Sequence, residues 1–330
     1  MPEEERPLQQ QQRSRDIQIM HSNDETVETK LQRIAEKAGR DPECRFTSLF
    51  HLVDKELLLG CFNALKEGKA SGIDRITKEQ YAGNLMENLD DLIGRLHRMA
   101  YIPQPVLRVY IPKAGSKKMR PLGIPALEDK LVQATLSKIL QAIYEQDFID
   151  DSYGFRPERS CHDALRIINQ TITGKGTNYI VEADIKGFFD NVDQDELMEF
   201  LAHRIADKRV LRYIKRFLKS GIHEEGVFRA SEKGTPQGGV ISPVLANLYL
   251  HYTLDLWFQR KYLKTCTGTA RLIRYADDFV VCFKQEADAK RFRIEMEKRL
   301  NQYGLEIAPE KTKILEFGPQ AQKRAKERGE

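Results

Sequence analysis

The chain has 330 residues, with 53 Lys and Arg against 49 Asp and Glu, so its formal net charge is +4. At about 100–200 residues per domain this length predicts two or three lobes, and any nucleic-acid binding must depend on where the charges lie. No apolar run approaches the roughly 18 residues that a membrane span requires, and the N-terminal sequence does not resemble a signal peptide. Five cysteines at irregular spacing argue against a disulfide framework or a zinc site, and they predict a reducing cytosol.

The first half of the chain is predicted to be helical and then to form a hairpin. Residues 1–28 have almost no apolar periodicity and are expected to be a flexible tail. Helical periodicity extends from residue 27 to residue 100, with breaks near residues 41–42 and 68–72. Strand periodicity at residues 107–111 and a returning strand at residues 119–124 predict a β-hairpin. One apolar face from Val132 to Ile143 predicts a long helix after it.

The second half mixes strands and helices. Residues 179–185 are strand-like, and Ser242-Pro243 is typical of a helix start. Residues 272–283 are predicted to form two apolar strands around a polar turn, and an amphipathic helix should follow. Residues 305–317 are predicted to form a last hairpin that turns at Pro309-Glu310. Strands separated by long helices, with antiparallel hairpins among them, indicate an α+β fold.

The strongest chemical signal is the sequence Tyr275-Ala276-Asp277-Asp278 between two apolar strands. Adjacent carboxylates at a hairpin tip repel each other, and a divalent cation would relieve that repulsion. Mg²⁺ uses only one or two protein carboxylates, together with phosphate oxygens and water. The competing interpretation is a solvated turn, since Asp is common in turns.

A second carboxylate, Asp184, stands at the end of the strand predicted at residues 179–185. If Asp184 lies beside Asp277, the two can hold a pair of metal ions that clamp the attacking and leaving oxygens of phosphoryl transfer. The competing role for Asp184 is a helix cap after the strand, which Asp190 would fill better.

Two basic stretches are candidate phosphate contacts. Between residues 95 and 120 there is no Asp or Glu, and the basic residues are Arg95, Arg98, Arg108, Lys113, Lys117, Lys118 and Arg120. An uncompensated stretch in such a balanced chain indicates phosphate contact, although a solvated loop is the alternative. Residues 204–219 form a second basic stripe. Its charged side chains either contact phosphate or only form the solvent-exposed face of a helix.

The segment Gly234-Thr235-Pro236-Gln237-Gly238-Gly239 precedes the helix predicted at Ser242. Its glycines let the backbone approach a ligand closely, and the N-terminus of a helix favours phosphate. The spacing of a P-loop is absent, and alone this segment is weak evidence.

Taken in order, these motifs resemble those of the reverse transcriptases encoded by bacterial group II introns. The resemblance runs from about residue 50 to about residue 318. The motifs are RPLGIP at 120–125, YGFRP at 153–157, ADIKGFFD at 183–190, PQGG at 236–239, YADD at 275–278 and EKTK at 310–313. Ser71-Gly72-Ile73-Asp74 matches an early fingers motif of the same family.

The resemblance implies a right-hand polymerase with a metal-dependent active site. Asp184 and Asp277 would carry two Mg²⁺ ions, for which Mn²⁺ could substitute, with the Ile185 carbonyl and Asp278 beside them. Lys113 and Arg120 would bind the triphosphate of the incoming nucleotide. Gln237 would line the nucleotide pocket, Phe189 would lie under the sugar and exclude a 2′-hydroxyl, and Lys311 belongs to the motif after the palm helix.

The resemblance also implies a domain order. Residues 29–175 would be fingers with a helical N-terminal extension, and residues 176–318 a palm whose antiparallel sheet is packed by helices. Residues 319–330 would be a charged tail leading towards a missing thumb. We expect from this a chain that extends primers poorly and exposes palm surface, which favours a homodimer at high concentration.

The activity implied is RNA-directed DNA synthesis. The partners would be an intron RNA template, a DNA or RNA primer and deoxynucleoside triphosphates, in a cytoplasmic ribonucleoprotein without a membrane. Arg95, Arg98, Arg108, Lys117 and Lys118 would contact RNA. Two alternatives stay open: an RNA-binding splicing factor with an unused polymerase site, and a free-standing reverse transcriptase of a defence or diversity-generating system.

Overall fold

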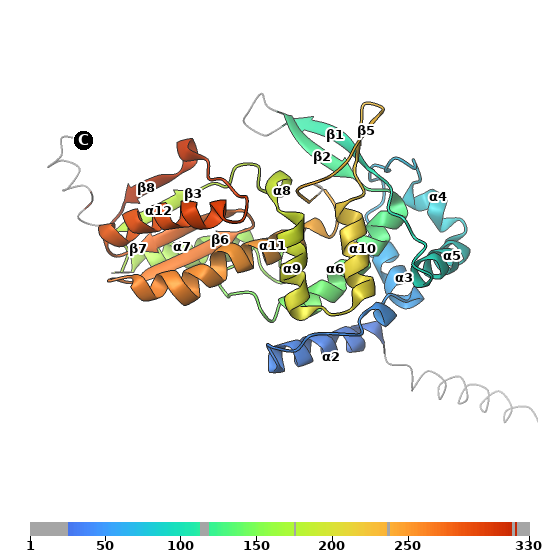
Figure 1. Cartoon of the computed structure of the whole chain (residues 1–330), viewed down its shortest axis with the longest axis horizontal. Coiled ribbons are helices and arrows are strands. Elements are labelled where there is room, and N and C mark those ends of the chain that lie inside the picture. Colours follow the sequence, from blue (N-terminus) through green and yellow to red (C-terminus); the bar gives the residue numbers. More distant parts are fainter. Residues whose placement is uncertain (1–25, 113–118, 175, 236–237, 319–320, 322–330) are drawn as a thin grey trace, which may run out of the picture.

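The computed structural model describes residues 26–112, 119–174, 176–235, 238–318 and 321. The described residues form two four-stranded sheets joined by helices; in Figure 1 one sheet lies to the left of the central helices and the other lies above them. One apolar core joins the N-terminal helices to the second sheet, because its buried residues include Leu58 and Leu136 of those helices and Val181 and Phe283 of that sheet. Long helices together with antiparallel hairpins confirm the α+β class.

The N-terminal part is helical, as its periodicity predicts. Thr26 caps the first helix by accepting a hydrogen bond from the Thr29 amide, and Asp54 caps α3 through the Leu57 amide. The long helix α6 is buried along most of its length, and α2 and α3 pack against it. The helices are α2 (Val27–Arg40), α3 (Lys55–Ala64), α4 (Lys78–Ala82), α5 (Leu85–His97) and α6 (Leu127–Tyr144).

The first sheet has the order β2-β1-β4-β5. Its strands are β1 (Val106–Pro112), β2 (Met119–Ile124), β4 (Ile222–Glu224) and β5 (Val227–Arg229). β1 pairs antiparallel with β2, as predicted, and parallel with β4. The first sheet therefore joins two segments that are about a hundred residues apart in the chain. Most side chains of β1 and β2 are half-buried or exposed.

The second sheet has the order β6-β7-β3-β8, and every neighbouring pair is antiparallel. Its strands are β3 (Tyr179–Ala183), β6 (Ala270–Tyr275), β7 (Asp278–Phe283) and β8 (Lys313–Glu316). One face, with Val181 and Phe283, lies in the main core against α12. The other face packs Ile273 and Cys282 against Ala164 of α7. The second sheet is thus covered on both faces. The main core and α12 cover one face, and α7 covers the other.

Six further α-helices lie in the described part, besides short 3₁₀ and π-helical segments. They are α7 (Cys161–Thr173), α8 (Phe188–Asn191), α9 (Gln194–Arg204), α10 (Lys208–Leu218), α11 (Ser242–Leu250) and α12 (Glu286–Asn301). α11 begins at Ser242 with Pro243 in its first turn, as predicted, and continues into a π-helical segment, His251–Asp255. No helix in the described ranges is long and apolar enough to cross a membrane. The five cysteines are all free thiols.

The hairpin predicted at residues 305–317 is wrong. Pro309–Lys311 form a single 3₁₀ turn, but the segments on its two sides do not pair with each other. Ile307 bridges Ile185, and β8 pairs with β3. The local apolar alternation does predict extended backbone here, but β3 offers a longer partner than the segment itself.

Candidate active site

The ends of β3 and β7 lie side by side in the second sheet. Their antiparallel pairing runs as far as Ala183 opposite Phe279, so the next residues along the two strands are Asp184 and Asp278. Side chains alternate between the faces of a sheet, which puts both carboxylates on the face that α7 covers in part. Both residues line the same pocket there. The fold therefore brings together the two motifs that the sequence separates by almost a hundred residues.

Asp277 lies in the two-residue turn between β6 and β7. Tyr275 and Asp278 are the last pair of this hairpin, and Ala276 has a φ of 57°. Two-residue hairpin turns favour positive φ, yet such a φ is uncommon for a residue that carries a Cβ. The conformation of Ala276 therefore needs support from its surroundings.

The environment of Asp277 disfavours its negative charge. Burial raises the pKa of the Asp277 carboxyl, and the neighbouring charge of Asp184 adds to that rise. The positive charges of Arg120 and Arg274 act in the opposite direction. Asp184 is thus close enough to Asp277 to repel it, and Arg120 of β2 is close enough to attract it.

A lysine already neutralises one of these carboxylates. Lys311 Nζ lies 2.5 Å from Asp184 Oδ2, and this contact raises the pKa of Lys311. Ala308 N–H donates to the Asp184 carbonyl, and Lys186 N–H donates to the Glu306 carbonyl. These two bonds hold the segment that carries Lys311 against the end of β3. The ammonium shows that a cation is well accommodated beside Asp184.

The donor set suits a hard divalent cation that is completed by substrate. Within the described ranges no three His, Cys, Asp or Glu side chains gather into a metal-binding group. Mg²⁺ does not need three, because it takes one or two protein carboxylates and fills its other positions with phosphate oxygens and water. The backbone adds a candidate oxygen: Ile185 and Ile307 form a non-hydrogen-bonded pair, so the Ile185 carbonyl is directed away from Ile307.

The carboxylates open into a pocket of about 590 Å³. Asp184, Asp278 and Lys311 line one part of it, and Ala164 and Leu165 of α7 line another. Leu165 is 59% exposed, so the apolar wall of the pocket is open to solvent. The pocket has room for a chain end or a ligand next to the acids.

A second pocket, of about 310 Å³, contains Phe189. Phe189 packs edge-on against buried Phe188 with their ring centroids 5.4 Å apart. Arg108 of β1 and Asp190 line the same pocket. Burial raises the pKa of Asp190, and the charge of Arg108 opposes that rise. The residue predicted to exclude a 2′-hydroxyl thus faces a cavity that also holds a basic side chain.

The glycine-rich segment connects this second pocket to β2. Thr235 N–H donates to the Phe189 carbonyl, and a Cβ on Gly234 would come within 2.7 Å of that same oxygen. Gly238 has a φ of 100°, and a Cβ there would come within 2.3 Å of the Gly123 carbonyl. Both glycines are required by close approach of the protein's own backbone, whereas the approach to a ligand that the sequence suggests stays a prediction. Gln237, Lys113, Lys117 and Lys118 lie outside the described residues.

The structure changes the interpretation of the basic stretch at residues 95–120. Arg95 is not uncompensated, because it forms ion pairs of 2.7 Å with both Asp91 and Glu128. Asp91 precedes the stretch and Glu128 follows it, so a count of acidic residues between 95 and 120 misses both partners. Arg98 is exposed, and Arg108 faces the Phe189 pocket. The early motif at Ser71-Gly72-Ile73-Asp74 packs on the start of α6, where Asp74 accepts from the Leu127 amide.

Two features of the site were missed by reasoning from sequence. One is the contact of Lys311 with Asp184, which depends on how residues 305–317 fold back on β3. The other is Arg274, which directly precedes the Tyr275-Ala276-Asp277-Asp278 motif and is fully buried. A charged residue within an apolar strand is a signal that could have identified Arg274, because a buried arginine requires a partner.

Comparison with known proteins gives a family match. The family model described as "Reverse transcriptase (RNA-dependent DNA polymerase)" matches residues 111–326. The chain is similar to the group II intron-encoded protein LtrA of Lactococcus lactis, with 40% identity over 222 residues. That alignment covers 67% of this chain and 37% of LtrA, so this chain spans well under half of that relative.

Two further relatives widen the comparison. Protein YkfC of Escherichia coli is 35% identical over 289 residues, which cover 78% of this chain and 76% of YkfC. A protein of Arabidopsis thaliana named nuclear intron maturase 1, mitochondrial, is 33% identical over 95 residues, which cover 29% of this chain and 13% of that protein. The region that the family model matches, residues 111–326, includes the motifs that form the site.

Proposed function

The chain belongs to the reverse transcriptase family, and from this premise we propose that it is an RNA-directed DNA polymerase of a group II intron. The reaction joins a deoxynucleoside triphosphate to the 3′-hydroxyl of a DNA or RNA primer on an RNA template. The observation that carries the proposal is that Asp184 and Asp278 line one pocket, while Asp277 of the adjoining turn lies close enough to Asp184 for the two charges to repel each other.

The carboxylates and the Ile185 carbonyl would hold two Mg²⁺ ions, with Mn²⁺ as a substitute. Bound there, the ions supply Lewis-acid stabilisation of the charge that develops on the transferred phosphoryl group. The protein's contribution is to orient Asp184 and Asp277 and to keep the pair only partly hydrated. Lys311 would hold Asp184 in place until substrate binds, since its ammonium contacts Asp184 Oδ2 and lines the same pocket.

The triphosphate would be bound from β2 and the β1–β2 hairpin. The charge of Arg120 lowers the pKa of Asp277, which supports a role for this guanidinium beside the carboxylates, where it would bind phosphate. Lys113 and Gln237 are assigned to the same pocket by their motifs. Phe189 would support the sugar and exclude a 2′-hydroxyl by contact. We assign residues 29–175 to fingers and 176–318 to palm, with β4 and β5 contributing to the fingers sheet.

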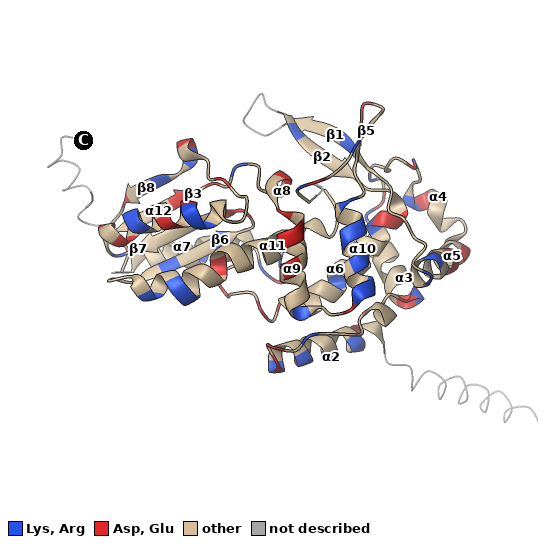
Figure 2. Cartoon of the chain, in the orientation of Figure 1, with Lys and Arg blue, Asp and Glu red and all other residues tan. Residues whose placement is uncertain are grey.

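The proposal includes binding of the parent intron RNA, in a cytoplasmic ribonucleoprotein. Its support is the basic stripe on α10, which we define as Lys208, Arg212 and Lys215. All three side chains are exposed, and no carboxylate in the described part of the chain pairs with them. They lie four and three residues apart, which places them along one side of the helix. Figure 2 shows this blue stripe next to the acidic residues of α9.

Not every basic residue of residues 204–219 belongs to that stripe. Arg204 is buried and donates to the Ala38 carbonyl, and Arg216 donates to the carbonyls of Met99 and Tyr101. These two residues hold the fold together. The exposed remainder also suits the alternative, an RNA-binding splicing factor whose polymerase site is unused.

Primer extension tests the proposal directly. The purified chain is given an RNA template, a DNA primer, deoxynucleoside triphosphates and Mg²⁺, and extended primer is measured. We expect extension that stops when Mg²⁺ is chelated and that is lost in the Asp277→Ala variant. If the parent chain binds RNA yet extends no primer with Mg²⁺ or Mn²⁺, the polymerase assignment is wrong and the splicing-factor alternative is favoured.

A further inference from the structure

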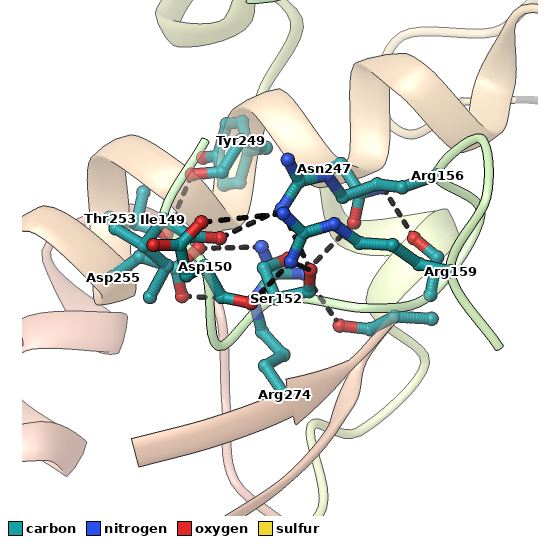
Figure 3. Close-up of polar contacts among 12 residues, drawn as sticks. Ile149, Asp150, Ser152, Arg156, Arg159, Asn247, Tyr249, Thr253, Asp255 and Arg274 are labelled. Atoms are coloured by element: carbon teal, nitrogen blue, oxygen red, sulfur yellow. Dashed lines mark hydrogen bonds and ion pairs between the residues drawn. The ribbon is translucent and has the colours of Figure 1, made fainter. Parts of the chain in front are cut away.

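A buried polar cluster lies directly beneath the turn that carries Asp277. We define the Arg274 cluster as Gly154, Asn247, Asp255 and Arg274, together with the Ala276 backbone that it contacts. Arg274 and Asp255 are both 0% exposed. The four residues come from three separate elements: the loop after α6, the α11 helix with its π-helical continuation, and β6. Figure 3 shows Asn247 and Asp255 of the helix gathered around Arg274.

The Arg274 guanidinium links the helix that carries Asn247 and Asp255 to the turn that carries Asp277. Its Nε and Nη2 atoms donate to the two carboxylate oxygens of Asp255, at 2.9 and 2.6 Å. Its Nη1 atom donates to Asn247 Oδ1 and to the Ala276 carbonyl, both at 2.9 Å. Three of these bonds anchor the arginine to one helix, and the fourth holds the residue next to Asp277. Planar, bidentate pairing of this kind is specific to arginine.

The helix is shaped so that both partners reach Arg274. Asn247 and Asp255 are eight residues apart, and in a continuous α-helix of 3.6 residues per turn they would point about 80° apart. His251–Asp255 is instead π-helical, with wider turns. Each residue then rotates the chain less, which returns Asp255 towards the side of Asn247. Irregular helical turns of this type are frequent at functional sites.

A second contact reaches the turn from the loop after α6. Asn247 Nδ2 donates to the Gly154 carbonyl at 2.7 Å, so the same asparagine ties this loop to Arg274. Gly154 lies directly against the turn, because a Cβ at this position would come within 2.2 Å of the Ala276 amide nitrogen. The Tyr153 amide donates to the Arg274 carbonyl at 2.8 Å. The loop therefore supports the turn from one side while Arg274 holds it from the other.

We propose that the Arg274 cluster positions Asp277 for catalysis, with Arg274, Asn247 and Gly154 as positioning residues that hold Ala276 in its positive-φ conformation. This inference rests on the proposed polymerase function and deepens it. A cluster that only filled the core would not need a hydrogen bond from the Arg274 guanidinium to the backbone of the turn. It would also not require a glycine at the one point where the loop touches Ala276.

The variant Gly154→Ala tests the proposal without removing any polar group. Its Cβ must push the Ala276-Asp277 backbone away, whereas Gly60→Ala is a matched control because a Cβ on Gly60 of α3 meets nothing within 4 Å. Single-nucleotide incorporation is measured with Mg²⁺ on a primer–template, together with the melting temperature and the hydrogen exchange of the peptide at residues 270–283.

We expect kcat to fall by tenfold or more in Gly154→Ala, since misplacement of a reacting group by about 1 Å can cost a hundredfold. The KM for the nucleotide and the melting temperature should change little, and exchange should accelerate at residues 275–278. Gly60→Ala should match the parent throughout. Parental kcat together with parental exchange in a folded Gly154→Ala variant would overturn the proposal.

If Gly154→Ala does not fold, the isosteric variant Asn247→Asp tests the positioning proposal in its place. It keeps an oxygen for Arg274 but loses the donor to the Gly154 carbonyl, so the same loss of kcat and the same faster exchange are expected. An unchanged kcat and exchange pattern in that variant overturn the inference. A parent chain that never incorporates nucleotide counts against the proposed function instead, and the exchange measurement then tests the positioning of the turn by itself.

Discussion

The two sheets of this chain contribute groups of opposite charge to the candidate site and hold them in different ways. The second sheet, β6-β7-β3-β8, ends in acids that burial, the backbone pairing of β3 and β7, and the Arg274 cluster hold in place. The first sheet, β2-β1-β4-β5, carries Arg108 and Arg120 on strands that are largely half-buried or exposed. Acids that hold metal ions need a precise arrangement, whereas bases that meet flexible phosphates can adapt to them.

The largest effect is expected from the acids of the second sheet. Asp184→Ala and Asp277→Ala should each lower the rate of nucleotide incorporation by about a thousandfold, because each removes stabilisation of charge that develops in the transition state. Melting temperature and RNA affinity should stay near those of the parent. Incorporation by Asp277→Ala at even a tenth of the parental rate would remove Asp277 from the catalytic site.

A buried carboxylate near the first sheet should behave differently, as a structural group. Asp129 of α6 accepts hydrogen bonds from the Tyr101 hydroxyl and the Gln104 amide, and burial raises its pKa to about 7. Because this pKa is raised, the folded state binds the proton more tightly than the unfolded state does. The stability that results is present below about pH 4 and is lost as the pH rises towards 7.

Asp129→Asn should therefore remove about 2–4 kcal/mol of pH dependence from the free energy of unfolding between pH 4 and 7. Denaturant unfolding across that range measures it, with Asn at exposed Asp195 as the control. A parallel pH profile for parent and Asp129→Asn would show that Asp129 is ionised in the fold. A thousandfold loss of nucleotide incorporation in Asp129→Asn would contradict the distinction between a structural Asp129 and the catalytic acids of the second sheet.

The pocket lined by Phe189 and by Arg108 of the first sheet should select the sugar. Phe189→Ala should lower the preference for deoxyribonucleotides over ribonucleotides by about tenfold or more, because a 2′-hydroxyl would no longer meet the ring. Phe189→Tyr keeps the ring and should keep most of the preference. The ratio of kcat/KM for a matched pair of nucleotides measures this effect. Equal discrimination by Phe189→Ala and the parent would mean that another side chain excludes the hydroxyl.

The smallest effect is expected on the outer surface, in the α10 stripe. The double variant Lys208→Ala/Lys215→Ala should weaken RNA binding several-fold and lower the salt slope of the binding constant by about 1.4, at about 0.7 per single-strand phosphate contact. The control is Lys55→Ala/Lys290→Ala, which removes two lysines that pair with Asp90 and Glu286. Equal slopes for the two double variants would show that the stripe is only a solvated face.

The sequence predicted the parts of the site that depend on local pattern or on a motif. The strands around Tyr275–Asp278 and the α+β class are confirmed, because the strands depend on short-range periodicity and the class depends on the order of the elements. Three contacts were not predicted: the pairing of Arg95 with Glu128, the contact of Lys311 with Asp184 and the strand partner of residues 313–316. Each joins segments that are far apart in the chain, and no local pattern encodes which partner is chosen.

The central claim is that the ends of β3 and the β6–β7 turn form one metal-binding site. The most direct test is to count bound Mn²⁺ by electron paramagnetic resonance, with the chain bound to primer–template and a non-hydrolysable deoxynucleoside triphosphate. Two ions per chain are expected for the parent, as in other two-metal phosphoryl-transfer sites. The variant Asp184→Asn/Asp277→Asn should bind the primer–template normally and hold fewer than one ion. Two ions in that double variant would contradict the account.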